Sequence, residues 1–349
     1  MRRVSLLLIM LWICLPVQAV VVVELHRAVV EVEDHSRRQL QQATRAGFAQ
    51  VLVKVSGSRE VLDNDEVRAA LSQSQRYMQR YQYLRQDDDS LRLQVHFDPQ
   101  LVNDLLRGAQ APLWTANRPP LLVWLIVDDA QGRHVANRES NPQLIEALSF
   151  ELERRGVPAV FPLYDLQDTV ALNTHDLWTM DPLAIFRASQ RYQVANVLIG
   201  RMTALGDDRW MGDWLYLYED ADVADSFYGQ PIPTFSAVAV DLVADRMASR
   251  YAVAAGDSQS AEVLIRVDAL ADYADYRKVL MYFENIELID AAWPAYLEGD
   301  SVVFRLHAQA DAEQLHRIIA LNRRLQRQET PLPLRHGPLN TALAYRWSR

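Results

Sequence analysis

Cysteine is almost missing from this chain of 349 residues, which contains only one, Cys14. Cys14 lies in an apolar N-terminal stretch that we expect to be removed, so the mature chain is predicted to contain no thiol. A chain without thiols forms no disulfide, has no thiolate nucleophile and holds no metal through cysteine. Cys14 follows Ile13 rather than a small residue, so the sequence also lacks the pattern of a lipoprotein signal.

The common motifs of catalysis and nucleotide binding are missing as well. The sequence has no phosphate-binding loop, no dinucleotide-binding glycine pattern, no nucleophile elbow and no zinc-protease helix motif. None of the eight histidines lies three or four residues from another, which excludes a helical pair of metal ligands. The sequence therefore predicts no metal site and no cofactor, and it favours a protein that is not an enzyme.

Basic residues are fewer than acidic ones, 36 against 45, and the formal net charge is −9. Residues 1–19 carry two arginines and no acid, so their removal leaves 34 basic and 45 acidic residues, a net charge of −11. An acidic chain without a basic run is a poor ligand for nucleic acid or an anionic membrane. We therefore expect no nucleic-acid partner.

The N-terminus has the organisation of a secretory signal. Arg2 and Arg3 precede the apolar stretch, and Val17-Gln18-Ala19 fits the small-residue cleavage pattern. The alternative is an uncleaved membrane anchor, for which the apolar stretch is short. We predict export to the periplasm with cleavage after Ala19, and no transmembrane segment in the mature chain.

An apolar run of seven residues, Leu121 to Val127, follows Pro119-Pro120 and ends at two aspartates. Seven residues are too few to span a membrane, and a continuous apolar run is typical of a strand covered on both faces. We interpret it as the central strand of a middle domain, residues 118–255. The predicted order of elements there, β-α-β-α-β-β-(β)-α, indicates a mixed sheet with helices.

Two smaller modules are predicted on either side of the middle domain. Residues 20–110 show the order β-α-α-β-β-α, in which Ser36 and Gln39 predict a helix capping box. Residues 261–325 show β-α-β-β-α, the core of a ferredoxin-like unit, and residues 326–349 form an extended tail that can add an edge strand. The sequence thus predicts an α+β protein of three small α/β sandwich-like modules, the last of them ferredoxin-like.

Several short motifs are distributed along the chain. They are Val51-Leu52-Val53-Lys54-Val55-Ser56-Gly57, Trp114, Arg118-Pro119-Pro120, Leu122-Val123-Trp124-Leu125, Arg155-Gly156, Val197-Leu198-Ile199-Gly200-Arg201 and Trp210-x-x-x-Trp214. With these motifs, most of residues 25 to 325 resembles an uncharacterised proteobacterial family of exported proteins, a domain-of-unknown-function family. The resemblance implies a location in the cell envelope, and it implies no activity and no catalytic residue.

Aromatic residues and one acidic pair are the candidate binding residues. Trp210 and Trp214 lie on one face of a predicted strand, and Trp178 lies in a predicted loop. Such an aromatic face can simply cover a helix, or it can stack on a sugar or dock a protein. Asp128 and Asp129 end the central strand, where open α/β sheets place ligands, and a solvated strand end is the alternative.

These observations favour an exported periplasmic interaction or scaffold protein whose partners are envelope proteins. Two alternatives stay open, an envelope glycan hydrolase that uses carboxylates and a small-ligand binder at the central sheet. Two carboxylates facing each other across a cleft would distinguish the hydrolase.

Overall fold

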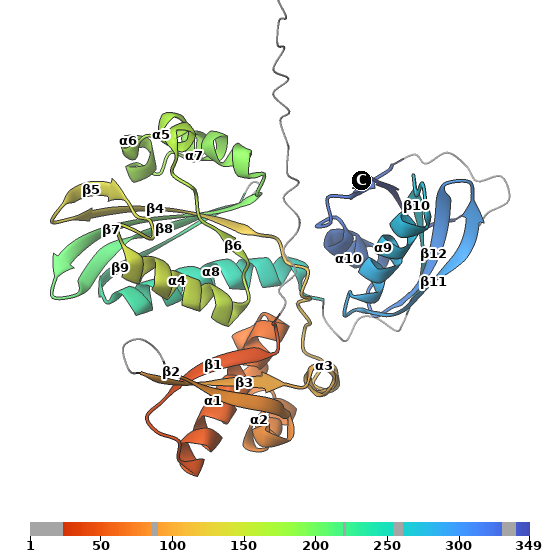
Figure 1. Ribbon diagram of the computed structural model, residues 1–349, viewed down its shortest axis with the longest axis horizontal. Coiled ribbons are helices and arrows are strands. Elements are labelled where there is room, and N and C mark those ends of the chain that lie inside the picture. Colours follow the sequence, from red (N-terminus) through yellow and green to blue (C-terminus); the bar gives the residue numbers. More distant parts are fainter. Residues whose placement is uncertain (1–23, 86–89, 219–220, 254–260, 330–339) are drawn as a thin grey trace, which may run out of the picture.

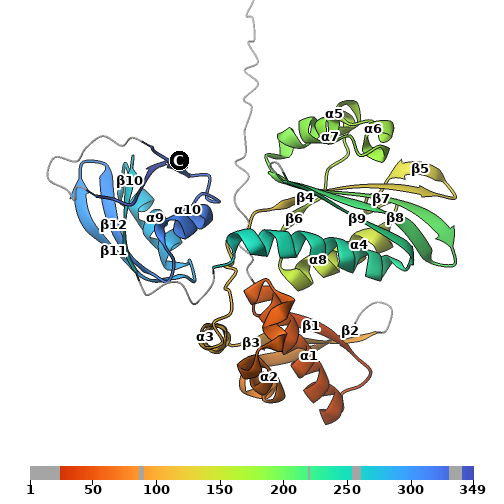
Figure 2. The same ribbon diagram turned by 180° about the vertical axis from the view of Figure 1, so that it is seen from behind.

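The computed structural model describes residues 24–85, 90–218, 221–253, 261–329 and 340–349. Three sheets organise these residues, each with its own helices, and they form the predicted α+β architecture (Figure 1 and Figure 2). The expected signal segment, the boundary expected near residues 255–261 and most of the proline-rich tail lie outside the described residues. Within the described part, no helix is both long and apolar enough to cross a membrane.

The N-terminal module has the predicted order of elements. Its antiparallel sheet has the strand order β1-β3-β2, and α1 packs on one face. Ser36 caps α1 as predicted, but the Gln39 side chain donates to Glu33, so the capping box is only half formed. The elements are β1 (Arg27–Val32), α1 (Arg37–Ser56), α2 (Asp65–Ser72), β2 (Met78–Arg85), β3 (Leu91–Phe97) and α3 (Pro99–Gly108).

The middle domain has one mixed sheet between two helical layers (Figure 1). The apolar run forms β4 (Leu121–Asp129), which is buried along residues 121–127 and pairs in parallel with β7. The strand order is β5-β4-β7-β8-β9, and β6 pairs with the first two residues of β4. Helices α4 and α8 cover one face, and α5, α6 and α7 cover the other. The remaining elements are β5 (Gly132–Val135), α4 (Pro142–Arg155), β6 (Ala159–Val160), α5 (Leu166–Ala171), α6 (Thr174–Trp178), α7 (Pro182–Ser189), β7 (Asn196–Gly206), β8 (Arg209–Tyr218), β9 (Ala221–Gln230) and α8 (Ile232–Tyr251).

Two parts of the middle domain differ from the prediction. Residues 164–180, predicted as a long loop or a loop with one turn of helix, contain two short helices, α5 and α6, because Asp165 and Asn173 each cap one of them. The chain after Asp129 folds back as β5, which the pattern does not predict, because Val135 is its only strong strand-forming residue.

The C-terminal module has the ferredoxin-like order with one more strand inside its sheet. The last strand, β14 (Leu343–Trp347), lies between β10 and β13, so the sheet order is β11-β12-β10-β14-β13. The edge position predicted for this strand is therefore wrong. An alternating pattern marks the buried face of a strand and does not show how many neighbours pair with it. The elements are β10 (Ala261–Asp268), α9 (Tyr273–Glu284), β11 (Ile289–Glu298), β12 (Ser301–Ala308), α10 (Ala312–Ile319) and β13 (Leu325–Arg327).

Candidate functional site

Residues 109–117, which connect the first and second modules, are hydrogen-bonded to all three modules. Trp114 N donates to Val55 O of α1 at 2.8 Å, and Leu113 exchanges two backbone hydrogen bonds with Val253, just after α8. On the side of the C-terminal module, Ala116 N donates to a carboxylate oxygen of Glu287 at 3.0 Å. The segment is therefore part of a shared junction.

Arg118 is the centre of this junction and is fully buried. Its guanidinium lies 3.7 Å from the ring centroid of Trp114. It donates hydrogen bonds of 2.7–3.0 Å to five backbone carbonyls, those of Lys54, Trp114, Thr115, Arg155 and Gly156. Burial lowers the pKa of Arg118 to about 9. All N–H donors of Arg118 are therefore used by carbonyls of α1, of the end of α4 and of the connecting segment. Arg118 holds these parts together and has no donor left for a ligand.

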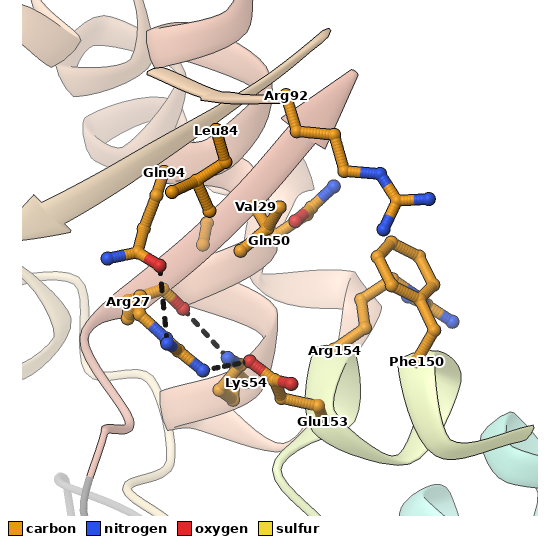
Figure 3. A pocket seen from close by; sticks show the side chains of 11 residues that line it. Arg27, Val29, Gln50, Lys54, Leu84, Arg92, Gln94, Phe150, Glu153 and Arg154 are labelled. Carbon is orange, nitrogen blue, oxygen red and sulfur yellow. Dashed lines mark hydrogen bonds and ion pairs between the residues drawn. The ribbon is translucent and has the colours of Figure 1, made fainter. Parts of the chain in front are cut away.

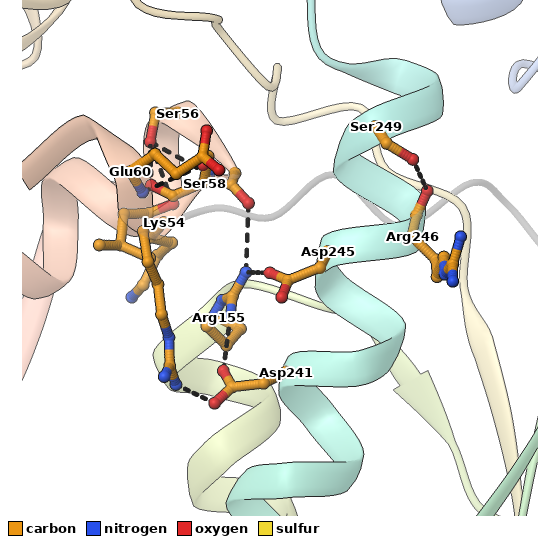
Figure 4. Close-up of polar contacts among 12 residues, drawn as sticks. Lys54, Ser56, Ser58, Glu60, Arg155, Asp241, Asp245, Arg246 and Ser249 are labelled. Atoms are coloured by element: carbon orange, nitrogen blue, oxygen red, sulfur yellow. Dashed lines mark hydrogen bonds and ion pairs between the residues drawn. The ribbon is translucent and has the colours of Figure 1, made fainter. Parts of the chain in front are cut away.

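A second buried arginine, Arg155 at the end of α4, ties α1 to α8 (Figure 4). It pairs with Asp241 at 2.5 Å and Asp245 at 2.6 Å on α8, and it donates to Gly57 O at 3.2 Å. Gly57 and Gly156 end α1 and α4 with positive φ. A Cβ at Gly57 would lie 2.4 Å from Ala248, and one at Gly156 would lie 2.7 Å from the Arg118 guanidinium. Four of the motifs singled out in the sequence therefore meet at this junction.

Asp128 and Asp129, the acidic candidates, point to opposite faces of the sheet, as neighbours on a strand do. Asp128 pairs with Arg133 of β5 at 3.1 Å. Asp129 accepts from the backbone of Gln131 and lies 3.9 Å from His134. The two carboxylates therefore do not face each other across a cleft.

Trp178 lies at the end of α6 and is half-buried. The Arg133 guanidinium lies 3.7 Å from its ring centroid, and Arg201 donates to its backbone oxygen at 3.1 Å. Arg133 thus brings Asp128 and Trp178 into one cluster, on the face of the sheet that α5, α6 and α7 cover.

Trp210 and Trp214 lie on the opposite face, toward α8. Trp214 is fully buried and stacks on Phe235 with ring centroids 4.2 Å apart. Gly200 makes room for it, since a Cβ there would come within 2.2 Å of the ring. Trp210 is half-buried against the same core. Of the three predicted tryptophans, Trp178 and Trp210 keep exposed surface.

A cavity of about 450 Å³ lies beside β4 in the middle domain. Strands β5 and β6 pair with the two ends of β4, and the cavity lies against the residues between them, Val123, Trp124 and Leu125. The segment Phe161–Tyr164 and residues from the end of β5 to α4 complete its walls. The sequence pattern did not indicate this cavity, because it depends on how short β5 and β6 are.

A set of exposed apolar side chains lies on α5, on α7 and just before α5, and the two helices lie side by side above the sheet (Figure 1). Its members are 60–80% exposed, and we call them the α5–α7 patch: Leu163, Leu166, Val170, Leu183 and Phe186. Sequence reasoning missed the patch. The available signal was that Leu183, Ile185 and Phe186 cannot all face one core, and only Ile185 is buried.

A charged network under the patch holds its helices in place. The Asp168 side chain is fully buried and accepts from Tyr164 N at 2.9 Å, the Tyr192 hydroxyl at 2.5 Å and Arg191 at 2.8 Å. Arg191 also pairs with Asp165, and this hydrogen bond lowers the pKa of the Asp165 carboxyl to about 2. The segments that carry the patch are therefore held together by hydrogen bonds between buried and half-buried side chains.

In the described part of the chain, no three or more potential metal-ligating side chains gather at one place. Residues 19–115 match a family model described as a domain of unknown function, DUF8605. No significant match to the chain is found among curated proteins or among solved structures. This match is consistent with the predicted resemblance to an uncharacterised family over residues 19–115, and the wider extent of that resemblance, the proteobacterial origin and the export stay predictions.

Proposed function

We propose that the protein is an exported, periplasmic interaction and scaffold protein of the cell envelope, which binds a partner protein without catalysis. The α5–α7 patch is the observation that carries the proposal. Five large apolar side chains are exposed on two neighbouring helices and on the segment just before them, which favours an interaction surface there. Because such side chains anchor protein interfaces, we place the partner contact there.

The buried junction supports the scaffold part of the proposal. Arg118 and Arg155 connect the N-terminal module with the middle domain through buried hydrogen bonds. The Asn117 side chain connects the same segment to the C-terminal module through Tyr282 and Ile318. A partner bound at the patch would therefore be held in a defined position relative to the other two modules.

The test is capture of crosslinked partners from periplasm by the mature protein. The double variant Leu166→Ser/Phe186→Ser removes two exposed anchors, and Leu297→Ser is the matched control, an exposed leucine on β11. Each true anchor should cost about 2 kcal/mol or more, roughly thirtyfold in affinity. We expect capture by wild type and control and loss in the double variant. Equal capture by all three proteins would refute the patch as the contact.

The periplasmic location has its own test, because the signal segment is a sequence-based prediction. Mass spectrometry of the protein from cells should find a mature chain that begins at Val20. A chain that begins at Met1 or carries lipid on Cys14 would contradict it.

A second candidate function is small-ligand binding in the cavity beside β4. Its volume of about 450 Å³ is in the range typical of small-molecule sites. Native mass spectrometry of the purified protein would detect a bound molecule. Ala136 lines the cavity, so Ala136→Phe should fill part of it and remove the bound molecule. Asp128 and Asp129 lie on opposite faces of the sheet, so this pair does not support the glycan-hydrolase alternative. Glycan turnover abolished by Asp128→Asn would overturn the binding proposal.

A further inference from the structure

A cleft separates the outer face of the N-terminal sheet from α4 (Figure 3). Its volume is about 210 Å³, roughly that of seven water molecules in the liquid at about 30 Å³ each. In Figure 3, Arg27 and Lys54 of the first module lie beside Glu153 of α4, and Arg92 lies above Phe150. The cleft combines charged groups, two side-chain amides and an apolar wall. The wall consists of Val29, Leu84 and Phe150.

Two of the four cations in the cleft have close carboxylate partners. Arg27 pairs with Glu24 at 2.8 Å and with Glu153. Arg154 pairs with Glu151 at 2.5 Å and with Asp241 at 3.1 Å. These two arginines therefore contribute little net attraction for an anion.

The third cation, Arg92, has a looser environment. Its nearest carboxylate is the exposed side chain of Glu31, at 3.6 Å. Its guanidinium lies 5.5 Å from the Phe150 ring centroid, and its buried Nε has no hydrogen-bond partner among the described residues.

Lys54 is the cation without a carboxylate partner. Its side chain is almost fully buried, at 3% exposure, and its ammonium donates to Arg27 O at 2.8 Å. Among the described residues no carboxylate lies within 4 Å of it. An ammonium has three donors, so two are spare. Burying this charge is costly, and burial lowers the pKa of Lys54 to about 8, although the more distant carboxylates of Glu153 and Glu24 act to raise it. A ligand that brought a negative charge would offset this cost.

We propose that this cleft binds a small monocarboxylate, with the carboxylate on the Lys54 ammonium and an apolar group against Val29, Leu84 and Phe150. Lys54 is the one cation lining the cleft with no carboxylate within 4 Å among the described residues, which matches a ligand with a single negative charge. Glu153 lines the same cleft and repels anions, so a dianion such as inorganic phosphate would meet stronger repulsion there than a monocarboxylate. The volume admits a ligand of few heavy atoms. This site is separate from the α5–α7 patch, so either proposal can fail without the other.

The chain contains only two lysines, Lys54 and the exposed Lys278, so a lysine-labelled protein gives two ¹³Cε signals. Lys278→Met assigns them. The probe is N-acetylalanine, compared with its neutral amide and with inorganic phosphate at constant ionic strength. We expect N-acetylalanine to shift the Lys54 signal saturably, the amide and phosphate to leave it unchanged, and Lys278 not to respond.

Two variants separate binding from folding. Lys54→Met should weaken N-acetylalanine binding, measured calorimetrically, at least about tenfold, because a charge-assisted hydrogen bond is lost. Lys278→Met should bind like wild type. A Lys54 signal unmoved up to about 50 mM N-acetylalanine would exclude a millimolar dissociation constant and overturn the proposal. An equal response to the neutral amide, or tighter binding of phosphate, would overturn it as well.

Discussion

Replacing Arg118 with methionine is expected to loosen the junction between the modules. The change keeps a long side chain over Trp114 but removes the guanidinium. Five backbone carbonyls then lose their donor inside a region that water does not reach. Two of these carbonyls end α4, and one belongs to the last turn of α1, so the loss acts on both helix ends.

The magnitude follows from two opposing effects. Removing the charge relieves the burial cost that lowers the pKa of Arg118 to about 9. Leaving buried acceptors without partners costs about 1–3 kcal/mol each, which outweighs that relief when five are affected. We therefore expect a net loss of about 3 kcal/mol or more from the unpaired carbonyls. For a domain of about 150 residues, such a loss of unfolding free energy corresponds to a fall in melting temperature of roughly 6 °C or more.

The assay is thermal unfolding of the mature protein together with limited proteolysis. Arg246→Met is the matched control, because Arg246 is an exposed arginine on α8 beside the junction (Figure 4). We expect Arg118→Met to melt earlier and to be cleaved first within residues 109–118, a segment protected in wild type and control. If Arg118→Met melts and is cleaved like Arg246→Met, the carbonyl bonds do not hold the modules together.

Three further predictions concern stability. Because the pKa of Lys54 is lowered by burial from 10.5 to about 8, the unfolded chain binds more protons between pH 8 and 10.5, and the free energy of unfolding should rise with pH there. Urea titrations should show that Lys54→Met removes on the order of 3 kcal/mol of this rise. Gly57→Ala should lower the free energy of unfolding in urea clearly more than Gly299→Ala does. Both glycines have positive φ, but only a Cβ at Gly57 would clash with Ala248. Equal losses would contradict the close packing. Trp214→Ala should cost about 3–5 kcal/mol in the same assay, and a loss below 1 kcal/mol would place that ring outside the core.

The parts of the fold that could be predicted are those written in local patterns. The apolar run of β4 predicted a strand covered on both faces, and residues 121–127 are buried there. Ser36 predicted a helix start through its capping side chain, and that cap is present. The period-two spacing of Trp210 and Trp214 predicted a shared face, which α8 covers. In each case the signal and its structural cause lie within one turn or one strand.

The parts that could not be predicted depend on contacts between distant residues. The position of β14 inside its sheet depends on pairing with β10, about 78 residues earlier in the chain. The junction escaped prediction because Arg118 contacts carbonyls 37 and 64 residues away, and a segment with Pro119-Pro120 resembles a linker in composition. The α5–α7 patch escaped because hydropathy alone does not distinguish a side chain that faces a core from one that faces a partner.

The placement of hydrogen-bond donors distinguishes the buried junction from the two places where binding is proposed. Arg118 donates hydrogen bonds to carbonyls of the protein itself, and Arg155 donates to a carbonyl and two carboxylates. These bonds fix the modules relative to one another. Arg191 does the same below the α5–α7 patch, where its hydrogen bonds to Asp165 and Asp168 hold the helices in place. The apolar side chains of the patch stay exposed to solvent. Lys54 differs, because it lies beside the junction with one donor used and no carboxylate partner. We therefore expect substitutions at the junction to lower stability. Substitutions in the α5–α7 patch should reduce partner capture, and substitution of Lys54 in the cleft should weaken ligand binding.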